Sequence, residues 1–160
     1  MGILGGGLLL LACPKANIPT LLWNTSNSVP FGLYWTTSRQ PVLGGLAVIR
    51  LPEPYRSLAD VRGYLGARAL LVKPIVASAG DIVCRHGAIV ILRERAMAYA
   101  RRADRMGRQL PHWTGCIRIH PDQIFVLSAD PNGFDSRYFG PVERQDVLGT
   151  ALPVWRHASD

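Results

Sequence analysis

The chain has 160 residues, of which 48% are hydrophobic and 18% charged, and it carries a formal net charge of +7. This length fits one domain with a real core, and the composition excludes a disordered chain. With 16 glycines and 12 prolines, turns are frequent and long helices unexpected, so we predict a mainly β fold with one or two short helices. The basic charge permits nucleic acid or an anionic membrane surface as a partner without requiring either.

The chain begins with an apolar run from Gly2 to Ala12 that contains no charge. The run is shorter than the roughly 20 residues of a membrane-spanning helix, but it has the length of the apolar part of an export signal. The alternative is a first strand or a buried arm. We expect residues 1–15 to form a signal or anchor segment and residues 16–160 to form the folded domain.

Short apolar or β-branched runs between turn signals predict strands along the rest of the chain. In chain order these strands cover residues 32–37, 46–51, 69–77, 82–84, 88–92, 124–127 and 147–155. A helix is expected over residues 56–66, where Leu58, Val61 and Leu65 have helical spacing.

The segment 93–108 is ambiguous. Its Ala, Arg, Glu and Met residues favour a helix, whereas the alternation of Ala96, Ala98 and Ala100 also allows a strand. Its six arginines fit either a phosphate-binding patch or a solvated, partly ion-paired face.

The cysteines Cys13, Cys84 and Cys116 lack the spacing of metal ligands. Cys84 and Cys116 can form a disulfide in an oxidising compartment, or they can be two ordinary buried thiols. The four histidines are isolated, and the chain has no phosphate-binding loop, H-E-x-x-H or G-x-S-x-G motif. We therefore expect no metal and no cofactor.

Ser28 and Lys73 are the candidate catalytic residues. A serine hydroxyl is a weak nucleophile until a base removes its proton, and a lysine can be that base only when it is neutral. Lys73 lies in the apolar run Leu70–Lys73, and burial there would lower the pKa of its amine. The pair predicts acyl transfer by a Ser-Lys dyad.

A third segment, residues 125–140, runs from a strand through an Asp-Pro-Asn-Gly turn into a polar and aromatic cluster. Asp135 in this cluster could orient a basic catalytic group and balance its charge. Equally, Asp135 and Arg137 could form a structural ion pair that holds the loop. The residues alone leave both interpretations open.

Taken in order, three segments resemble the conserved boxes of type I signal peptidases. They are residues 26–30 (SNSVP), residues 71–73 (LVK) continuing to 79–81 (AGD), and residues 135–140 (DSRYFG). Residues 24–34, 107–113 and 149–155 are similar to the TraF branch, the conjugative-transfer peptidases. The resemblance covers roughly residues 20–156. It implies the Ser-Lys β-fold of signal peptidases and makes residues 16–160 a catalytic peptidase domain.

The resemblance also implies roles for individual residues. Ser28 matches the nucleophile and Lys73 the general base, and Asp135 matches an aspartate implicated in activity. Ser26 matches a position whose hydroxyl helps the backbone N–H of Ser28 to form the oxyanion hole. The chain departs from the pattern at Gly133, where many members have a serine that helps to hold the lysine.

The function implied is that of a serine peptidase of a conjugative transfer system, a type IV secretion system. It would process, and in the TraF branch cyclise, a propilin precursor at the periplasmic face of the inner membrane. Its expected partners are the propilin polypeptide, the membrane surface and the conjugative transfer machinery, with nucleic acid not expected. Two alternatives are a DNA-linked self-cleaving regulator and a non-catalytic assembly factor of the pilus or secretion apparatus.

Overall fold

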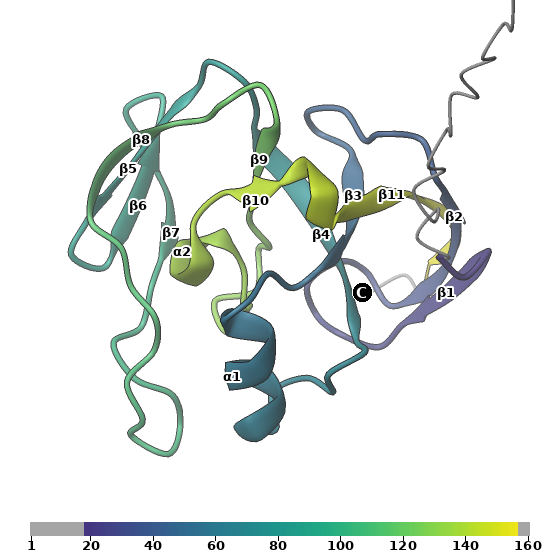
Figure 1. Cartoon of the computed structure of the whole chain (residues 1–160), viewed down its shortest axis with the longest axis horizontal. Helices are drawn as coiled ribbons and strands as arrows, with labels where there is room; N and C mark the ends of the chain where they lie inside the picture. Colours follow the sequence, from purple (N-terminus) through teal and green to yellow (C-terminus); the bar gives the residue numbers. More distant parts are fainter. Residues whose placement is uncertain (1–17, 157–160) are drawn as a thin grey trace, which may run out of the picture.

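The computed structural model describes residues 18–156, which form two antiparallel sheets with two short helices (Figure 1). The larger sheet has seven strands in the order β1 (Leu21–Asn24), β2 (Gly32–Thr37), β11 (Val147–Arg156), β3 (Leu46–Arg50), β4 (Leu70–Ala77), β9 (Gln123–Val126) and β10 (Val142–Glu143). The smaller sheet has the order β7 (Arg95–Tyr99), β6 (Ile89–Leu92), β5 (Ile82–His86) and β8 (Gly115–Arg118). The predicted mainly β fold is confirmed.

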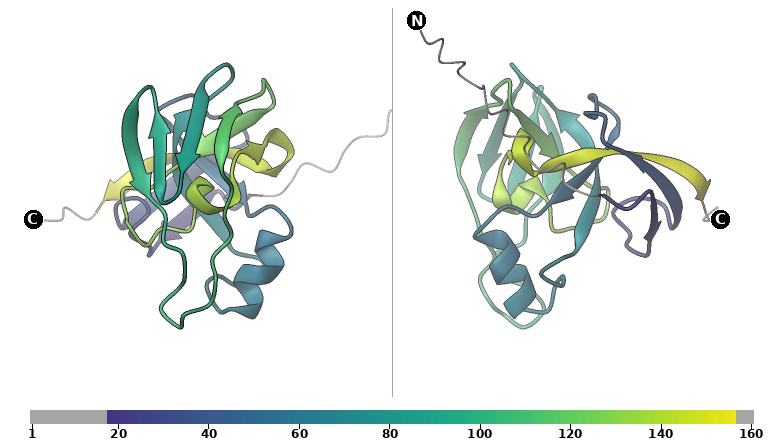
Figure 2. Two further views of the ribbon diagram at one scale, coloured as in Figure 1. Left: turned by 90° about the vertical axis from the view of Figure 1, so that its left-hand side faces the viewer. Right: turned by 45° about the vertical axis from the view of Figure 1, so that its right-hand side comes forward.

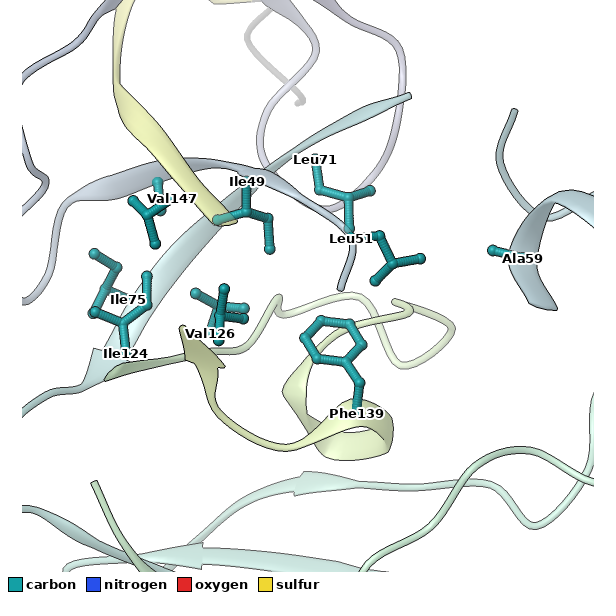
Figure 3. Close-up of a cluster of buried hydrophobic side chains, with 11 residues drawn as sticks. Ile49, Leu51, Ala59, Leu71, Ile75, Ile124, Val126, Phe139 and Val147 are labelled. Carbon is teal, nitrogen blue, oxygen red and sulfur yellow. The ribbon is translucent and has the colours of Figure 1, made fainter. Parts of the chain in front are cut away.

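Helix α1 (Tyr55–Val61) and helix α2 (Ser136–Phe139) lie on the larger sheet, and a short 3-10 helix (Arg144–Asp146) precedes β11. The main core cluster fills the space between β3, β4, β9 and these helices (Figure 3). Ile49, Ile75, Val126 and Phe139 are nearly solvent-free within it. This packing fixes β4, the strand that carries Lys73, at the centre of the molecule.

The smaller sheet stands to one side of the larger one, as the two views in Figure 2 show. A second cluster joins them, because Ala77 and Phe125 of the larger sheet pack against Val83 and Val90 of the smaller sheet. Residues 18–156 contain no helix that is long and apolar enough to cross a membrane. The expected segment of residues 1–15 lies outside the described residues.

Each of the predicted strands is present, with shifts of one or two residues at several ends. The predicted helix over 56–66 is shorter and runs over Tyr55–Val61. It stops there because Gly63 adopts a left-handed conformation with φ of 69°, which is typical of a helix C-terminus. Val61, expected on the buried face, is 86% exposed.

The ambiguous segment 93–108 is not a helix. Arg93 and Glu94 have φ of 50° and 64° and form the two-residue turn of a hairpin between β6 and β7. The strand interpretation therefore holds for residues 95–99, and pairing with β6 outweighs the local helix propensity. Residues 100–114 form a long loop, closed by a bridge between Ala103 and Gln109.

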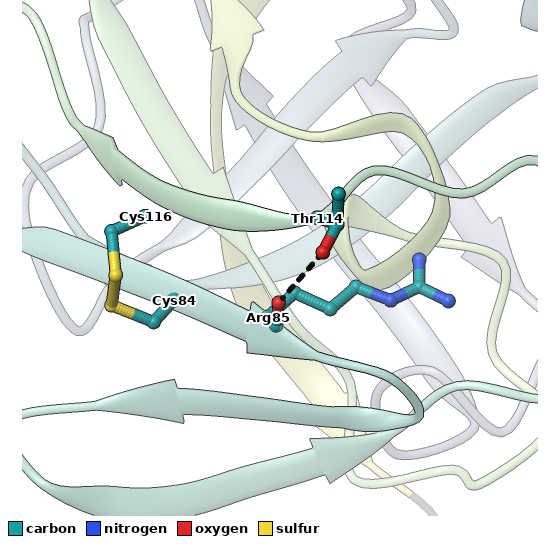
Figure 4. The surroundings of a disulfide bond; sticks show 4 residues. All are labelled: Cys84, Arg85, Thr114 and Cys116. Carbon is teal, nitrogen blue, oxygen red and sulfur yellow. Dashed lines mark hydrogen bonds between the residues drawn. A yellow bond between two sulfur atoms is a disulfide. The ribbon is translucent and has the colours of Figure 1, made fainter.

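Cys84 of β5 and Cys116 of β8 are paired on neighbouring strands of the smaller sheet and form a disulfide (Figure 4). The disulfide interpretation is confirmed, and the alternative of two buried thiols is wrong, since Cys116 is exposed. The side chain of His86 lies beside the two sulfurs. Because the sulfurs are bonded to each other, they do not act as thiolate ligands for a metal.

Candidate active site

The Nζ atom of Lys73 lies 2.6 Å from the Oγ atom of Ser28. The two residues are 45 positions apart in the sequence, and the fold brings them together from a loop and a strand. Ser28 lies in the loop between β1 and β2, and Lys73 lies in β4 opposite Ala47 of β3. This distance is within the range at which a base removes the proton of a nucleophile.

The environment of Lys73 favours a neutral amine. Its side chain is 2% exposed, and this burial lowers the pKa of the amine from 10.5 to about 8. The carboxylates of Asp135 and Asp130 act in the opposite direction and raise that pKa, whereas Arg137 lowers it. A substantial fraction of Lys73 is therefore neutral at mildly alkaline pH, as a general base requires.

The loop that carries Ser28 is held by Asn24, the last residue of β1. The Asn24 Nδ2 group donates to the backbone carbonyls of Ser26 at 2.8 Å and of Val29 at 2.9 Å. The Tyr34 hydroxyl adds a hydrogen bond of 2.7 Å to the carbonyl of Pro30. These contacts place Ser28 against Lys73, because they fix the backbone on both sides of it.

Sequence reasoning missed this role of Asn24. The signal for it was an asparagine at the end of an apolar run, since Asn side chains commonly bond to backbone groups in turns. The side chain of Ser26 is also engaged, because its hydroxyl donates to Asn24 Oδ1 at 2.8 Å. Ser26 lines the same cleft as Ser28 and Lys73, and its hydroxyl is bonded to Asn24.

Asp135 and Arg137 form a buried ion pair, with 2.8 Å between Arg137 Nε and Asp135 Oδ1. The Asp135 carboxylate also accepts hydrogen bonds from the backbone N–H and the hydroxyl of Ser128, at 2.9 and 3.0 Å. It caps α2 by accepting from the Arg137 backbone N–H at 3.1 Å. The structural ion pair is thus present, and Asp135 acts on Lys73 through its charge.

The glycine at position 133 has a local steric cause. A Cβ atom at Gly133 would lie 2.1 Å from the hydroxyl oxygen of Ser128. The Ser128 hydroxyl occupies that space and bonds to Asp135 Oδ2. A serine at position 133 would not fit unless Ser128 moved. Ser128 belongs to the site's supporting network and was not identified from the sequence.

A cleft of about 950 Å³ opens beside the dyad. Ser28 and Lys73 lie on its wall, together with β1 residues and the first residues of β4. Two strand edges border it. β1 is an edge strand of the larger sheet, and β9 pairs with β4 only from Ile75 onward, which leaves the side of Leu70–Lys73 unpaired. An extended peptide can pair with such edges.

The site combines a buried lysine amine, a serine hydrogen-bonded to that amine, and two open strand edges. Together these features are those of a serine peptidase. The family model described as "Signal peptidase, peptidase S26" matches residues 8–155, which is nearly the whole chain. The chain belongs to this family.

Relatives of the chain include plasmid and conjugal transfer proteins. The chain is 31% identical to the plasmid transfer protein TraF of Escherichia coli over 163 residues, which cover 94% of this chain and 92% of that protein. It is 33% identical to the conjugal transfer protein TraF of Agrobacterium fabrum over 143 residues, 82% of this chain and 80% of that protein.

A crystal structure of a signal peptidase I from Enterococcus faecalis V583 is also similar. It has 15% sequence identity to this chain and a TM-score of 0.42, and the match covers 71% of this chain and 98% of that one. At this level the likeness carries no weight for function.

Proposed function

We propose that this protein is a Ser-Lys peptidase that processes the propilin of a conjugative pilus. The distance of 2.6 Å between Lys73 Nζ and Ser28 Oγ carries the proposal. The TraF relatives, which are named as transfer proteins, support the assignment to conjugation. The partners would be the propilin chain and the machinery of the type IV secretion system.

In the proposed reaction, neutral Lys73 takes the proton of the Ser28 hydroxyl while Oγ attacks the scissile carbonyl. The new C–O bond gives a tetrahedral oxyanion. The oxyanion is held by the Ser28 backbone N–H, and a donor of this kind contributes about 3–4 kcal/mol. Lys73 then gives its proton to the departing amine as the C–N bond breaks, which leaves an acyl-enzyme.

The acyl-enzyme has two possible acceptors. Attack by water breaks the ester and yields a linear product with a carboxylate. Attack by the amino terminus of the same propilin breaks the ester, forms a peptide bond and yields a circular product that is lighter than the linear product by one water. In both cases Ser28 regains its proton through Lys73.

Ser26 would assist as a second oxyanion donor. Its hydroxyl can turn from Asn24 Oδ1 toward the substrate, since the two residues are joined only by hydrogen bonds. Asn24 would then keep its contacts with the loop backbone. The Ser28 N–H remains the main donor in this scheme.

The experiment that tests the proposal is mass spectrometry of propilin incubated with the wild type and with three variants. Ser28→Ala and Lys73→Ala are expected to abolish product, because each removes one reacting group. Ser26→Ala is expected to retain partial activity, because the Ser28 N–H remains. Product of unchanged amount from Ser28→Ala would contradict the mechanism. No product from the wild type would favour an assembly role.

We also propose that the protein works at the inner membrane, on the periplasmic side. The outer face of β1, β2 and β11 is apolar, and register places two rows of side chains on it. The rows are Leu21, Trp35 and Leu152, and Trp23, Leu33 and Trp155. Tryptophan is enriched where proteins meet the membrane interface, and the net charge of +7 suits anionic lipids.

A further inference from the structure

The cleft beside the dyad has a strongly basic far half. Five arginines line it, namely Arg62, Arg68, Arg101, Arg105 and Arg108, against two acids, Asp104 and Asp130. Asp130 belongs to the end near the dyad, since its charge acts on Lys73. None of the five arginines is among the charges that shift the pKa of Lys73, so we place the excess of positive charge in the part of the cleft away from the dyad.

Hydrogen bonds hold the framework of this basic wall together. Asp104 is its centre, because it accepts hydrogen bonds from the Tyr64 hydroxyl and from Arg108 Nε. Arg62 Nη1 donates to the carbonyl of Gln109 at 2.7 Å. These bonds join the end of α1 to the long loop after β7, and Figure 2 shows the two running side by side. The wall is thus built from two distant segments and held in place.

Three of the arginines are not used in this framework. Within residues 18–156, the guanidinium groups of Arg68, Arg101 and Arg105 have no hydrogen-bond or ion-pair partner. All three are exposed and border the same cleft. Arg108, by contrast, is neutralised by Asp104 at 2.6 Å. The cleft therefore offers three free cations to whatever binds in it.

We infer that this basic half of the cleft binds a carboxylate of the substrate peptide, either an acidic side chain or the chain terminus. The inference rests on the proposed function, because it takes the cleft beside Ser28 as the peptide site. Guanidinium groups match carboxylates in geometry and bind them with two parallel hydrogen bonds. An acidic segment would also be drawn into the cleft by the positive field.

A peptide fits this wall better than nucleic acid does. Leu65, Met106, Leu110 and Phe134 line the same cleft as the arginines. Peptide side chains can fill apolar surface next to a carboxylate, whereas a phosphate backbone needs a continuous basic groove. Phe134 moreover packs against Tyr64 and Tyr138, so its ring is not free to stack on a base.

The test measures binding of short fluorescent peptides to full-length Ser28→Ala protein, which cannot cut them. One peptide carries glutamates, its copy carries glutamines, and each is made with an amidated and a free C-terminus. At low salt we expect the glutamate peptide to bind roughly tenfold more tightly than its glutamine copy, or the free-acid form to bind roughly tenfold more tightly than the amidated form. This advantage should shrink as salt is added.

Two triple variants on this background place the effect in the cleft. Arg68, Arg101 and Arg105 are changed to Gln in one, and Arg39, Arg95 and Arg102 in the other. The control arginines are exposed as well, and Arg102 is next to Arg101, but none of them lines the cleft. The cleft triple variant should lose the preference for the carboxylate, and the control should keep it. Melting curves check that both fold.

Equal binding of all four peptides would overturn the inference. So would an equal loss of the carboxylate preference in both triple variants, because the preference would then depend only on the overall positive charge of the protein. A single-stranded DNA oligonucleotide that displaces the peptides and depends on the cleft arginines, without any carboxylate preference, would assign the wall to nucleic acid. Propilin cleavage by the wild type is scored separately. A carboxylate preference without cleavage would refute the proposed function and leave the binding site standing.

Discussion

Lys73 shows at the scale of one residue how burial tunes a catalytic base. Its amine has a pKa of about 8, and only the neutral form can take the proton of Ser28. We therefore expect kcat/KM for propilin to rise about tenfold per pH unit below pH 8 and to level off above it. The measurement is the pH profile of cleavage, with circular dichroism at each pH as a check that the enzyme stays folded. A flat profile below pH 8 would refute Lys73 as the base.

The same pKa shift affects stability. Between pH 8 and 10.5 the unfolded chain binds more protons at Lys73 than the folded protein does, so stability rises with pH there. Below pH 8 the folded protein bears the full cost of a charged buried amine. Lys73→Met is thus expected to raise the free energy of unfolding by about 2–3 kcal/mol at neutral pH.

This gain should disappear as the pH approaches 10.5, because the amine is then neutral in both states. Urea unfolding of both proteins at several pH values measures it. A gain that is the same at every pH would show that packing, and not the charge, explains it.

At the scale of elements, Asp135 connects α2 to the end of β9. It caps the helix, accepts two hydrogen bonds from Ser128, and pairs with Arg137, which is 1% exposed. Asp135→Asn leaves the Arg137 guanidinium buried without a counter-charge, and loss of one partner of a buried pair costs about 3–5 kcal/mol. Chemical unfolding measures this loss.

Glu53→Gln is the matched control, because it removes one partner of the exposed pair with Arg56 and should be nearly neutral. Asp135→Asn should also shift the pH profile of cleavage to lower pH, because the Asp135 charge raises the pKa of Lys73. Unchanged stability together with an unchanged profile would contradict both roles.

At the scale of the whole molecule, the apolar face of β1, β2 and β11 adjoins the active-site cleft, because Trp23 of this face also lines the cleft. Trp35 and Leu152 are paired on neighbouring strands of this face and are 47% and 51% exposed. The double change to Ser is expected to weaken binding to anionic lipid vesicles by at least about tenfold, because it removes apolar area that would enter the interface.

Co-sedimentation of the full chain with the vesicles measures this effect. Val61→Ser is the control, since Val61 is 86% exposed and belongs to α1, which lies apart from β1, β2 and β11 (Figure 1). Equal vesicle binding by the double variant and the wild type would contradict the proposed membrane surface.

Much of this architecture could be predicted from local patterns. The strands at 32–37 and 69–77 can be predicted because runs of strand-forming residues lie between turn residues. Both signals are local, since each depends on only a few neighbouring positions. Local rules left the segment 93–108 undecided. Its composition favours a helix, but residues 95–99 pair as a strand with β6 and the residues after them form a loop. The turn at Arg93 and Glu94 lacks the Asn-Gly or Asp-Gly signal of such hairpins.

The sequence by itself determined which chemistry the chain carries: a serine, an amine in an apolar run, and an aspartate with a nearby arginine. Only the tertiary structure decided how these groups act. It brought Lys73 to Ser28 across 45 positions, bound Asp135 to Arg137 and Ser128, and gave Asn24 its role in the loop. The reason is physical: proton transfer and pKa depend on distances and burial, which arise when distant segments pack together.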